Sequence, residues 1–353
     1  MNITPEISII LPVYNAEKFI NRTLRNIVLE QFNAFPESAW EIIAVNDCSS
    51  DSSAKILDTW HRLYPDNIKI ISFDRRSGVS NARNAAIQSV KGAFIYMMDA
   101  DDLLPQGVLK MLINTAKTNN ADLVRFAYRQ ISPEEYASYN MSAPRLPDFV
   151  NFRSYTATEF LNITHGLIEF PGLWSVWSSL FRMDFIKNNH LQFIPNLIIG
   201  EDCLFQWTAM LHNPRMSVST AQLYLYTKNP DGCINGVDTS HIARKADGLT
   251  KLAELEKEFI HNNRPAVSQT VTQGWTQALT YVLRDRLACL IAINSPIAIT
   301  FAALKEFILY RGIISPSQHP FCLPSVKLSP KASLIAWIAT RICACAKKFY
   351  KSK

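Results

Sequence analysis

The sequence is poor in glycine and lacks the glycine-rich motifs that bind phosphate groups in many nucleotide-binding proteins. It has 11 glycines in 353 residues, with no GxGxxG, no GxxxxGKS and no GxxxxGKT. These motifs mark dinucleotide-binding and ATP phosphate-loop sites. Both kinds of site are therefore excluded, and a bound phosphate would have to be neutralised by a metal ion or by side chains such as Arg83.

Paired cysteines and a secretion signal are also missing. The seven cysteines are odd in number and scattered, and none lies in a CxxC pair. This pattern is typical of reduced thiols in a cytosolic protein. The amino end lacks a basic n-region and its apolar run is broken by Pro12, which indicates a strand and not a signal peptide. We therefore expect the protein in the cytoplasm or on the cytoplasmic face of the inner membrane.

The sequence lacks an uninterrupted apolar segment of membrane-spanning length. The apolar stretch from Leu287 to Leu304 is broken by Asn294, Ser295 and Pro296. A membrane span needs about 20 consecutive apolar residues, so buried helices are expected there instead. The chain is 48% hydrophobic and 19% charged, which is typical of a globular protein.

Positive charge is concentrated at the carboxyl end. The net charge is +6, and residues 347–353 contain four lysines and no acidic residue. In a helix over residues 332–350, most apolar side chains gather on one face. This pattern indicates peripheral contact with an anionic membrane and not with nucleic acid. A helix packed on the protein's own core is the alternative interpretation.

Strands and helices alternate through the first 130 residues. Short apolar runs typical of buried strands are followed by segments with helical spacing of apolar residues. This alternation predicts an α/β fold with a mostly parallel sheet flanked by helices. The predicted strands are 7–13, 40–45, 68–73, 93–98 and 122–128; the predicted helices are 17–30, one that begins at Ser50-Asp51, 79–90 and 107–119.

The regular alternation ends near residue 131. Segment 132–155 contains three prolines and is typical of a loop or an insertion. Trp174 and Trp177 are expected in the core because they lie in an apolar segment. Further helices are predicted at 156–169, 203–211, 236–259 and 332–350, with a strand at 216–226.

The segment FIYMMDADDLL, residues 94–104, carries the clearest chemical signal. Its apolar run stops abruptly at Asp99, Asp101 and Asp102. Because side chains alternate in an extended chain, Asp99 and Asp101 lie on the same side. Together they can hold one Mg²⁺ or Mn²⁺ that keeps water and phosphate ligands. The alternative is a solvated acidic turn that caps the next helix, although capping needs a single Asp.

Three other predicted strands also end in polar or aromatic residues. In open α/β sheets, ligands bind at the carboxyl ends of the strands. Together these residues suit a nucleotide. An aromatic ring can stack on the base, a carboxylate can accept from a base N–H, and a metal ion can bind the phosphates. The strand ends in question are Tyr14-Asn15, Asn46-Asp47, Asp74-Arg75 and the Asp99–Asp102 segment.

The segments SIILPVYNAEKFI, VNDCSSDSS, SGVSNARNAAI and MMDADDLL resemble, in order and spacing, four successive blocks of the family 2 glycosyltransferases with the GT-A fold. The resemblance covers about residues 5–130. A second stretch, VWSSLFRMDFIKNN followed by IIGEDCLF, is similar to the acceptor half of bacterial enzymes that build lipopolysaccharide, capsule or other surface glycans. The resemblance implies an inverting, Mg²⁺- or Mn²⁺-dependent transferase that moves a sugar from a nucleotide sugar, expected to be a UDP-sugar, to a glycan or lipid-linked acceptor.

The resemblance also implies a Rossmann-like GT-A domain with a helical carboxyl-terminal extension. Residues 1–130 would form the nucleotide-sugar-binding half and residues 131–235 the acceptor-binding half. Residues 236–353 would form a helical region with the membrane-contacting segment at its end.

Site roles follow from the resemblance, residue by residue. The donor-site residues would be Pro12, Val13, Tyr14 and Glu17 around the nucleoside, Asp47 at the uracil N3–H, Arg83 near the diphosphate, Asp99 at the ribose or donor sugar, and Ala100 and Asp101 in the same block.

The metal site would be formed by Asp101 and Asp99, with Asp102 in support. Asp202 would be the general base, with Glu201 as the next candidate. Two positions depart from the family pattern: Asn46 stands where an acid is usual, and Cys48 replaces a common glycine, which makes that turn less free.

Simpler interpretations of single residues remain. Taken alone, Glu201-Asp202 fits an ordinary helix start, and Tyr14 fits a half-buried aromatic at a strand end. A nucleotidyltransferase and a non-catalytic nucleotide-sugar-binding module of the same fold are the alternative functions. The nucleotidyltransferase is disfavoured because the chain lacks a glycine- and arginine-rich nucleotide loop near its amino end. The retention of Asp47, Asp99, Asp101 and Asp202 together argues against the non-catalytic module.

Overall fold

The computed structural model describes residues 4–139, 144–146, 150–163, 175–229, 239–263, 267–292 and 303. Its contacts divide the chain into two compact units. The first unit comprises Met1–Phe160 and Glu169–Asn229, and the second comprises Leu161–Ile168 and Pro230–Lys353. All of the predicted donor, metal and base residues lie in the first unit.

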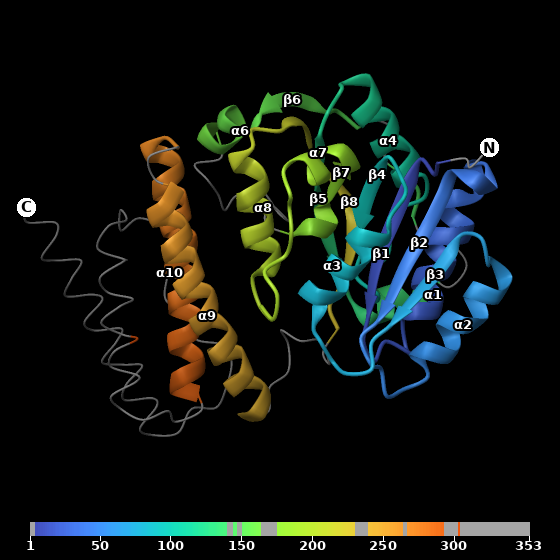
Figure 1. The fold of residues 1–353 in the computed structure, drawn as a ribbon, viewed down its shortest axis with the longest axis horizontal. Helices are drawn as coiled ribbons and strands as arrows, with labels where there is room; N and C mark the ends of the chain where they lie inside the picture. The colour runs from blue at the N-terminus through green and yellow to red at the C-terminus, as the bar shows by residue number, and fades with distance from the viewer. Residues whose placement is uncertain are drawn as a thin grey trace, which may run out of the picture. The chain divides into compact units, whose positions relative to one another are not determined.

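The first unit is built on one eight-stranded sheet with the order β3-β2-β1-β4-β7-β5-β8-β6, which is visible in Figure 1. Strands β1 to β4 are mutually parallel, as are β5 and β8, while β7 and β6 run antiparallel to their neighbours. The predicted mostly parallel sheet is therefore confirmed. The strands are β1 (Ile7–Val13), β2 (Trp40–Asn46), β3 (Ile68–Ser72), β4 (Phe94–Met97), β5 (Leu123–Ile131), β6 (Arg153–Thr156), β7 (Ser179–Arg182) and β8 (Arg215–Thr227).

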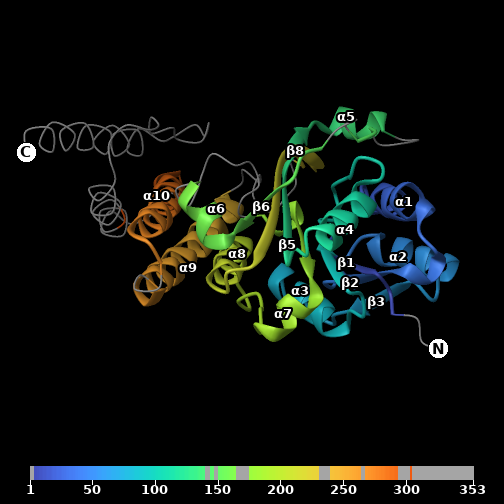
Figure 2. The same ribbon diagram turned by 90° about the horizontal axis from the view of Figure 1, so that it is seen from above.

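The central strands are apolar because both faces of the sheet are covered. Figure 2 shows helices α1 and α4 on one face and α3 and α7 on the other. The helices of this unit that precede β5 are α1 (Ile20–Arg25), the π-helical η1 (Asn26–Gln31), the short 3₁₀ turns η2 (Phe32–Ala34) and η3 (Glu37–Ala39), α2 (Ser53–Leu63), α3 (Val79–Ser89) and α4 (Val108–Thr118).

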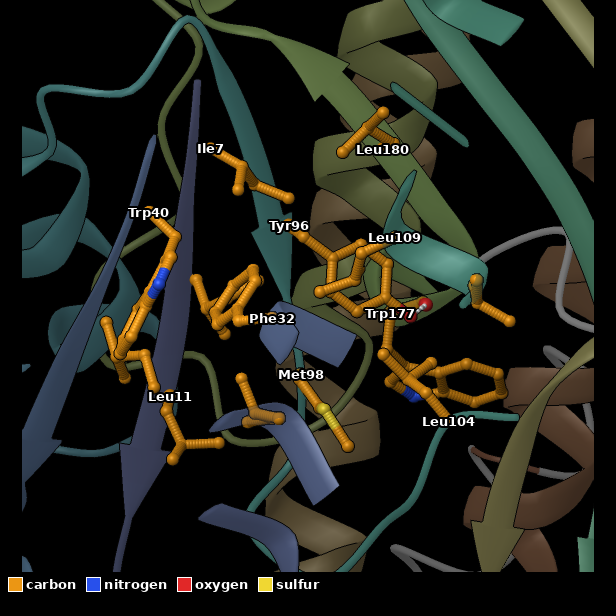
Figure 3. Close-up of a cluster of buried hydrophobic side chains, with 14 of the residues drawn as sticks. Ile7, Leu11, Phe32, Trp40, Tyr96, Met98, Leu104, Leu109, Trp177 and Leu180 are labelled. Carbon is orange, nitrogen blue, oxygen red and sulfur yellow. Dashed lines mark hydrogen bonds between the residues drawn. The ribbon is translucent and has the colours of Figure 1, made fainter. Parts of the chain in front are cut away.

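A single core cluster joins β1, β2 and β4 to α1, η1 and α4. In Figure 3, Phe32 and Trp40 face each other, with parallel rings whose centroids are 4.6 Å apart. Tyr96 and Leu109 lie on the other side of the same cluster. Each fully buried side chain of this size stabilises the fold by roughly 1.5–3 kcal/mol, so the ends of β1, β2 and β4 are held firmly in register.

The helix predicted over residues 17–30 differs from the observed segment. Regular α-helix covers only Ile20–Arg25, and the chain continues as a π-helix over Asn26–Gln31. The wider π turn brings the polar side chains of Asn26 and Gln31 into the interior. π-Helical turns are often found at functional sites, and this one lies against the segment that contains Asp99 to Asp102.

The interpretation of 132–155 as loop is wrong at both ends of that segment. Helix α5 (Pro133–Ser138) begins there, capped by the Ser132 hydroxyl, which accepts from the Glu135 N–H. At the other end, β6 pairs with β8. The remaining elements of this part of the chain are α6 (Ala157–Ile163), the 3₁₀ turn η4 (Val176–Ser178), α7 (Met183–Asn188) and α8 (Glu201–Leu211).

The described part of the second unit is helical. Helices α9 (Thr239–Asn263) and α10 (Gln269–Ala292) pack together, with the rings of Phe259 and Trp275 in edge contact at 5.1 Å. Among the residues that the structure describes, no helix is long and apolar enough to cross a membrane. The predicted helix over 332–350, Trp174 and most of the 287–304 stretch lie outside the described residues.

Candidate functional site

The carboxyl ends of three neighbouring strands bring the predicted donor residues to one edge of the sheet. Tyr14 follows β1, Asp47 follows β2, and Asp99 lies two residues beyond β4. The backbone continues the ladder past the strands, since the Asp47 N–H donates to the Val13 carbonyl and the Met98 N–H to the Ile10 carbonyl. The convergence expected from the sequence is therefore observed for these three positions.

The carboxylate loop, residues 99–102, places its three acids in different surroundings. Asp102 is fully buried, and its two oxygens accept from the Tyr224 hydroxyl and the Thr227 N–H, each at 2.6 Å. Burial, with the charges of Asp101 and Asp99, raises the pKa of Asp102 well above its ordinary value. Asp102 therefore anchors the loop to β8 from within the protein.

Asp101 and Asp99 are more accessible than Asp102. Asp101 accepts from the Asn229 amide nitrogen at 2.9 Å. Burial and then the charge of Asp99 raise the pKa of Asp101 to about 6. Two carboxylates close enough to repel each other suit a hard divalent cation, which would relieve that repulsion.

A metal ion at the carboxylate loop would have few protein ligands. In the part of the chain that the structure describes, no three His, Cys, Asp or Glu side chains form a metal-binding group. A magnesium-like ion bound together with substrate phosphates needs only one or two protein carboxylates. Asp99 and Asp101 thus fit such an ion, and their role as ligands stays a prediction.

The opposite side of the carboxylate loop is held by buried polar groups of α1 and η1. The Thr23 hydroxyl donates to the carbonyls of Ala100 and Asp102 at 2.9 and 3.1 Å. Asn26 makes a two-way contact with the Leu104 backbone, accepting from its N–H at 2.8 Å and donating to its carbonyl at 3.0 Å. Sequence reasoning missed both positioning residues, because a Thr and an Asn in a helical pattern give no local sign of where they point.

Arg83 lies at the centre of an ionic cluster that joins distant parts of the chain. It is 2% exposed and projects from α3. Its guanidinium donates to Asp99 at 2.9 Å, to Asp202 at 2.6 Å and to Glu201 at 3.1 Å. One cation is shared by three carboxylates, so the cluster carries a net charge of about −2 when all are ionised. The prediction placed Arg83 near the donor; the observed bonds place it between Asp99 and Glu201-Asp202.

Asp202 has a raised pKa in spite of its bond to Arg83. Its second oxygen accepts from the Val176 N–H at 3.1 Å, and its side chain is 18% exposed. Burial raises its pKa, opposed by Arg83 and reinforced by Glu201 and Asp99, to about 8. A carboxylate with such a pKa can take up a proton near neutral pH, where an ordinary Asp cannot.

The loop that leads into Asp202 is fixed to α3 by a row of polar side chains. The Asn84 amide bonds both the N–H and the carbonyl of Phe193, each at 2.9 Å, and the Ser80 hydroxyl donates to the Leu197 carbonyl. Gly200, with φ of 77°, then turns the chain into α8. The segment SNARN therefore positions the loop that carries Asp202, a role that its sequence alone did not reveal.

Asp47 does more than the sequence predicted. It is 4% exposed, and its oxygens accept from the backbone N–H groups of Ser77 and Gly78 at 2.6 and 2.8 Å. It thereby holds the turn before α3. Each carboxylate oxygen has a second lone pair, so contact with a uracil N–H stays a prediction.

Tyr14 and Glu17 lie at the outer part of this edge. Tyr14 is 38% exposed, and the Arg76 guanidinium carbon lies 4.0 Å from its ring centroid. Glu17 accepts from the Ser52 N–H at 2.9 Å, which ties it to the start of α2. Val13 and Ala100 are buried and Pro12 is half-buried, so these three residues shape the edge chiefly through their backbone. Their contacts with a nucleoside stay predictions.

Trp177 is buried, as expected. Its ring stacks on Tyr224, with centroids 4.4 Å apart. Its carbonyl accepts from the Tyr96 hydroxyl at 2.6 Å. Trp177 thus supports the Tyr224 hydroxyl that holds Asp102, and it acts on the site through packing.

Comparison with known proteins identifies a matching family model and several similar curated proteins. Residues 8–181 match the model of the family described as Glycosyl transferase family 2. The chain is 39% identical over 226 residues to the minor teichoic acid biosynthesis protein GgaA of Bacillus subtilis (strain 168), which covers 64% of this chain and 47% of that protein. The chain spans less than two thirds of the length of the first curated relatives that it matches.

Two solved structures show the same fold. S. aureus TarS 1-349 in complex with UDP-GlcNAc is similar with a TM-score of 0.54 and 21% identity, over 87% of this chain and 90% of that one. The mannosyltransferase PcManGT from Pyrobaculum calidifontis, in complex with GDP-Man and Mn²⁺, has a TM-score of 0.54 and 16% identity, over 99% and 88%. The predicted GT-A architecture is confirmed.

Proposed function

We propose that this chain, whose residues 8–181 belong to glycosyltransferase family 2, transfers a sugar from a nucleotide sugar to a hydroxyl group of a glycan or lipid-linked acceptor. The reaction would invert the anomeric centre. The observation that carries the proposal is the Arg83 cluster, in which one buried guanidinium bonds Asp99 and Asp202. Arg83 thereby holds Asp99, the proposed donor-site carboxylate, close to Asp202, the proposed base, so both could act on one bound donor and acceptor.

The donor would lie along the edge formed by the ends of β1, β2 and β4. Tyr14 would offer its exposed ring to a base, and Asp47, bonded to the turn before α3, would offer a carboxylate oxygen. We propose a UDP-sugar as donor, because the similar TarS structure is described as a complex with UDP-GlcNAc.

A divalent cation would be held by Asp101 and Asp99, with Asp102 in support from the interior. When bound, Mg²⁺ or Mn²⁺ would offset negative charge on the diphosphate leaving group. The proposal is supported by the repulsion between Asp99 and Asp101 and by the Mn²⁺ named for the PcManGT complex.

Asp202 would take the proton from the acceptor hydroxyl. Arg83 and the Val176 N–H fix its carboxylate from two sides, which leaves a base of defined orientation. A single base and direct displacement by the acceptor oxygen invert the anomeric carbon, and an α-linked donor would give a β-linked product. Glu201, bonded to the same guanidinium, would keep the pKa of Asp202 high by its charge.

The acceptor would belong to a bacterial surface polysaccharide. This proposal is supported by relatives whose names refer to minor teichoic acid biosynthesis and to poly(ribitol-phosphate) glycosyl transfer. Acceptors of this kind are assembled at a membrane, so we also propose that residues 332–350 bring the protein to the cytoplasmic face of the inner membrane.

The direct test is a panel of sugar nucleotides incubated with the protein, Mn²⁺ and polyol-phosphate or lipid-linked acceptors. We expect release of UDP from one UDP-sugar and transfer of its sugar. Release of pyrophosphate would instead identify a nucleotidyltransferase. Binding of UDP without any turnover over the whole panel would favour a non-catalytic binding module.

A further inference from the structure

The end of β8 lies across the carboxylate loop and touches two of its acids. The Tyr224 hydroxyl and the Thr227 N–H both bond Asp102. Two residues later, the Asn229 side-chain nitrogen lies 2.9 Å from Asp101 Oδ2. Asp102 thus attaches the carboxylate loop to β8, and Asn229 contacts the more accessible Asp101.

The spacing between Asn229 and Asp101 is that of two neighbouring ligands around one ion. Ligand oxygens about 2.1 Å from an octahedral Mg²⁺ lie about 3 Å apart when they are adjacent. The observed separation of 2.9 Å is that of an N–H···O hydrogen bond, and it is also compatible with this ligand spacing. Rotation about the last side-chain bond of Asn229 exchanges its nitrogen and oxygen, so the amide oxygen can take the same position.

We propose that Asn229 supplies a third protein oxygen to the divalent cation held by Asp99 and Asp101. This inference rests on the proposed function, since it deepens the metal site of the same reaction. Amide and carboxylate oxygens are hard ligands that favour Mg²⁺ and Mn²⁺ over softer ions. The set Asp99, Asp101 and Asn229 contains only such oxygens, which suits Mg²⁺ or Mn²⁺.

A purely structural role for Asn229 would require its N–H group, whereas ligation requires its oxygen. Substitution by aspartate separates the two roles, because Asp keeps an oxygen at this position and loses the donor. Substitution by alanine removes both groups. Asn189, whose amide bonds the Phe185 carbonyl, offers a matched control in the same unit, away from the carboxylate loop.

The experiment measures UDP affinity by calorimetry with Mn²⁺ and again with EDTA, for the full chain and its variants. We expect Mn²⁺ to strengthen UDP binding by the wild type and by N189A. We expect N229A to lose roughly ten-fold or more in Mn²⁺-dependent affinity, while N229D retains it. Affinity in EDTA should be equal in all four proteins.

Three outcomes would overturn the inference. If N229A responds to Mn²⁺ as the wild type does, Asn229 is not a ligand, although the metal site itself stands. If N229D loses the Mn²⁺ effect together with N229A, the hydrogen bond to Asp101 is what matters. If Mn²⁺ has no effect on the wild type, the proposed metal dependence fails and the inference fails with it.

Discussion

At the scale of single residues, the site depends on one guanidinium that bonds three carboxylates. Arg83 is bonded to Asp99, Glu201 and Asp202, and its own pKa is raised by these carboxylates in spite of its burial. Because three anions share one cation, Asp202 is oriented by Arg83 without losing its basicity. The same group therefore orients the proposed base, Asp202, and connects it to Asp99 at the proposed donor edge.

The role of Asp202 can be tested by Asp202→Asn. The amide preserves size and much of the hydrogen bonding, but it cannot take up the acceptor proton. We expect kcat to fall by about 10²–10⁴, with UDP affinity nearly unchanged. Glu201→Gln is the matched control and should have the smaller effect. Wild-type turnover by Asp202→Asn would place the base elsewhere.

The raised pKa of Asp202 predicts the pH dependence of transfer. Only the ionised form accepts a proton, so the rate should increase as the pH rises through the pKa of about 8. At saturating substrate, we expect kcat to be roughly ten-fold lower at pH 7 than at pH 9. This can be measured as a pH profile of kcat, and a profile that is flat from pH 6 to 9 would contradict the assignment.

Cys48 has a strained backbone conformation at a turn where glycine would be free of strain. Its φ is 58°, in the left-handed region that costs a non-glycine residue about 1–2 kcal/mol. We expect Cys48→Gly to raise the melting temperature modestly, partly offset by the greater freedom of glycine in the unfolded chain. Cys48→Ala, which keeps the Cβ, should give no such gain.

At the scale of secondary-structure elements, the carboxylate loop is held between two of them. β8 bonds Asp102, and Asn229, two residues after β8, bonds Asp101. Thr23 of α1 bonds two loop carbonyls, and Asn26 of η1 bonds Leu104 just after the loop. Asn26, the first residue of the π-helical segment, accepts from the Leu104 N–H. The loop thus has little freedom, which suits a site that must present carboxylates in a fixed geometry.

The importance of this arrangement can be tested by Asn26→Ala. The change leaves the buried N–H of Leu104 without its partner and weakens the bonding of its carbonyl. Each buried group that loses its partner costs about 1–3 kcal/mol. We expect a lower melting temperature and a weaker Mn²⁺-dependent UDP affinity. Asn114→Ala, at an exposed amide on α4, should change neither, and equal stability of both variants would argue against the role of Asn26.

At the scale of the whole molecule, the proposed chemistry lies in one unit of the chain. All proposed donor, metal and base residues are found within Met1–Phe160 and Glu169–Asn229. The second unit contributes helices α9 and α10 in its described part. A function for its carboxyl-terminal residues is therefore best sought outside the reaction itself.

Residues 332–353, the tail, are expected to bind the protein to an anionic membrane surface. Four lysines at residues 347–353 would each contribute about 1 kcal/mol near an anionic leaflet, an attraction that salt screens. We expect the full chain to co-sediment with anionic vesicles at low salt and to dissociate at high salt. A chain that ends at Pro330 should still bind UDP and remain in the supernatant. Unfolding of this shorter chain, or unchanged vesicle binding, would show that the tail packs on the core.

The sequence alone determined the alternating fold of residues 1–130 and the identity of the carboxylates. An apolar run such as ISIILPV, bounded by turn residues and alternating with helical segments, favours a strand buried in a parallel sheet, and strands that are parallel neighbours end at the same edge. Only the tertiary structure showed that Arg83 bonds Asp202, 119 residues away, and that Asp102 faces inward. It also showed that Asn229 bonds Asp101 in the carboxylate loop and that Asn26 bonds Leu104 just after it. These contacts join segments far apart in the chain, and their polar side chains leave no periodic trace in the sequence, because a buried polar residue is stabilised by its partner and not by its neighbours.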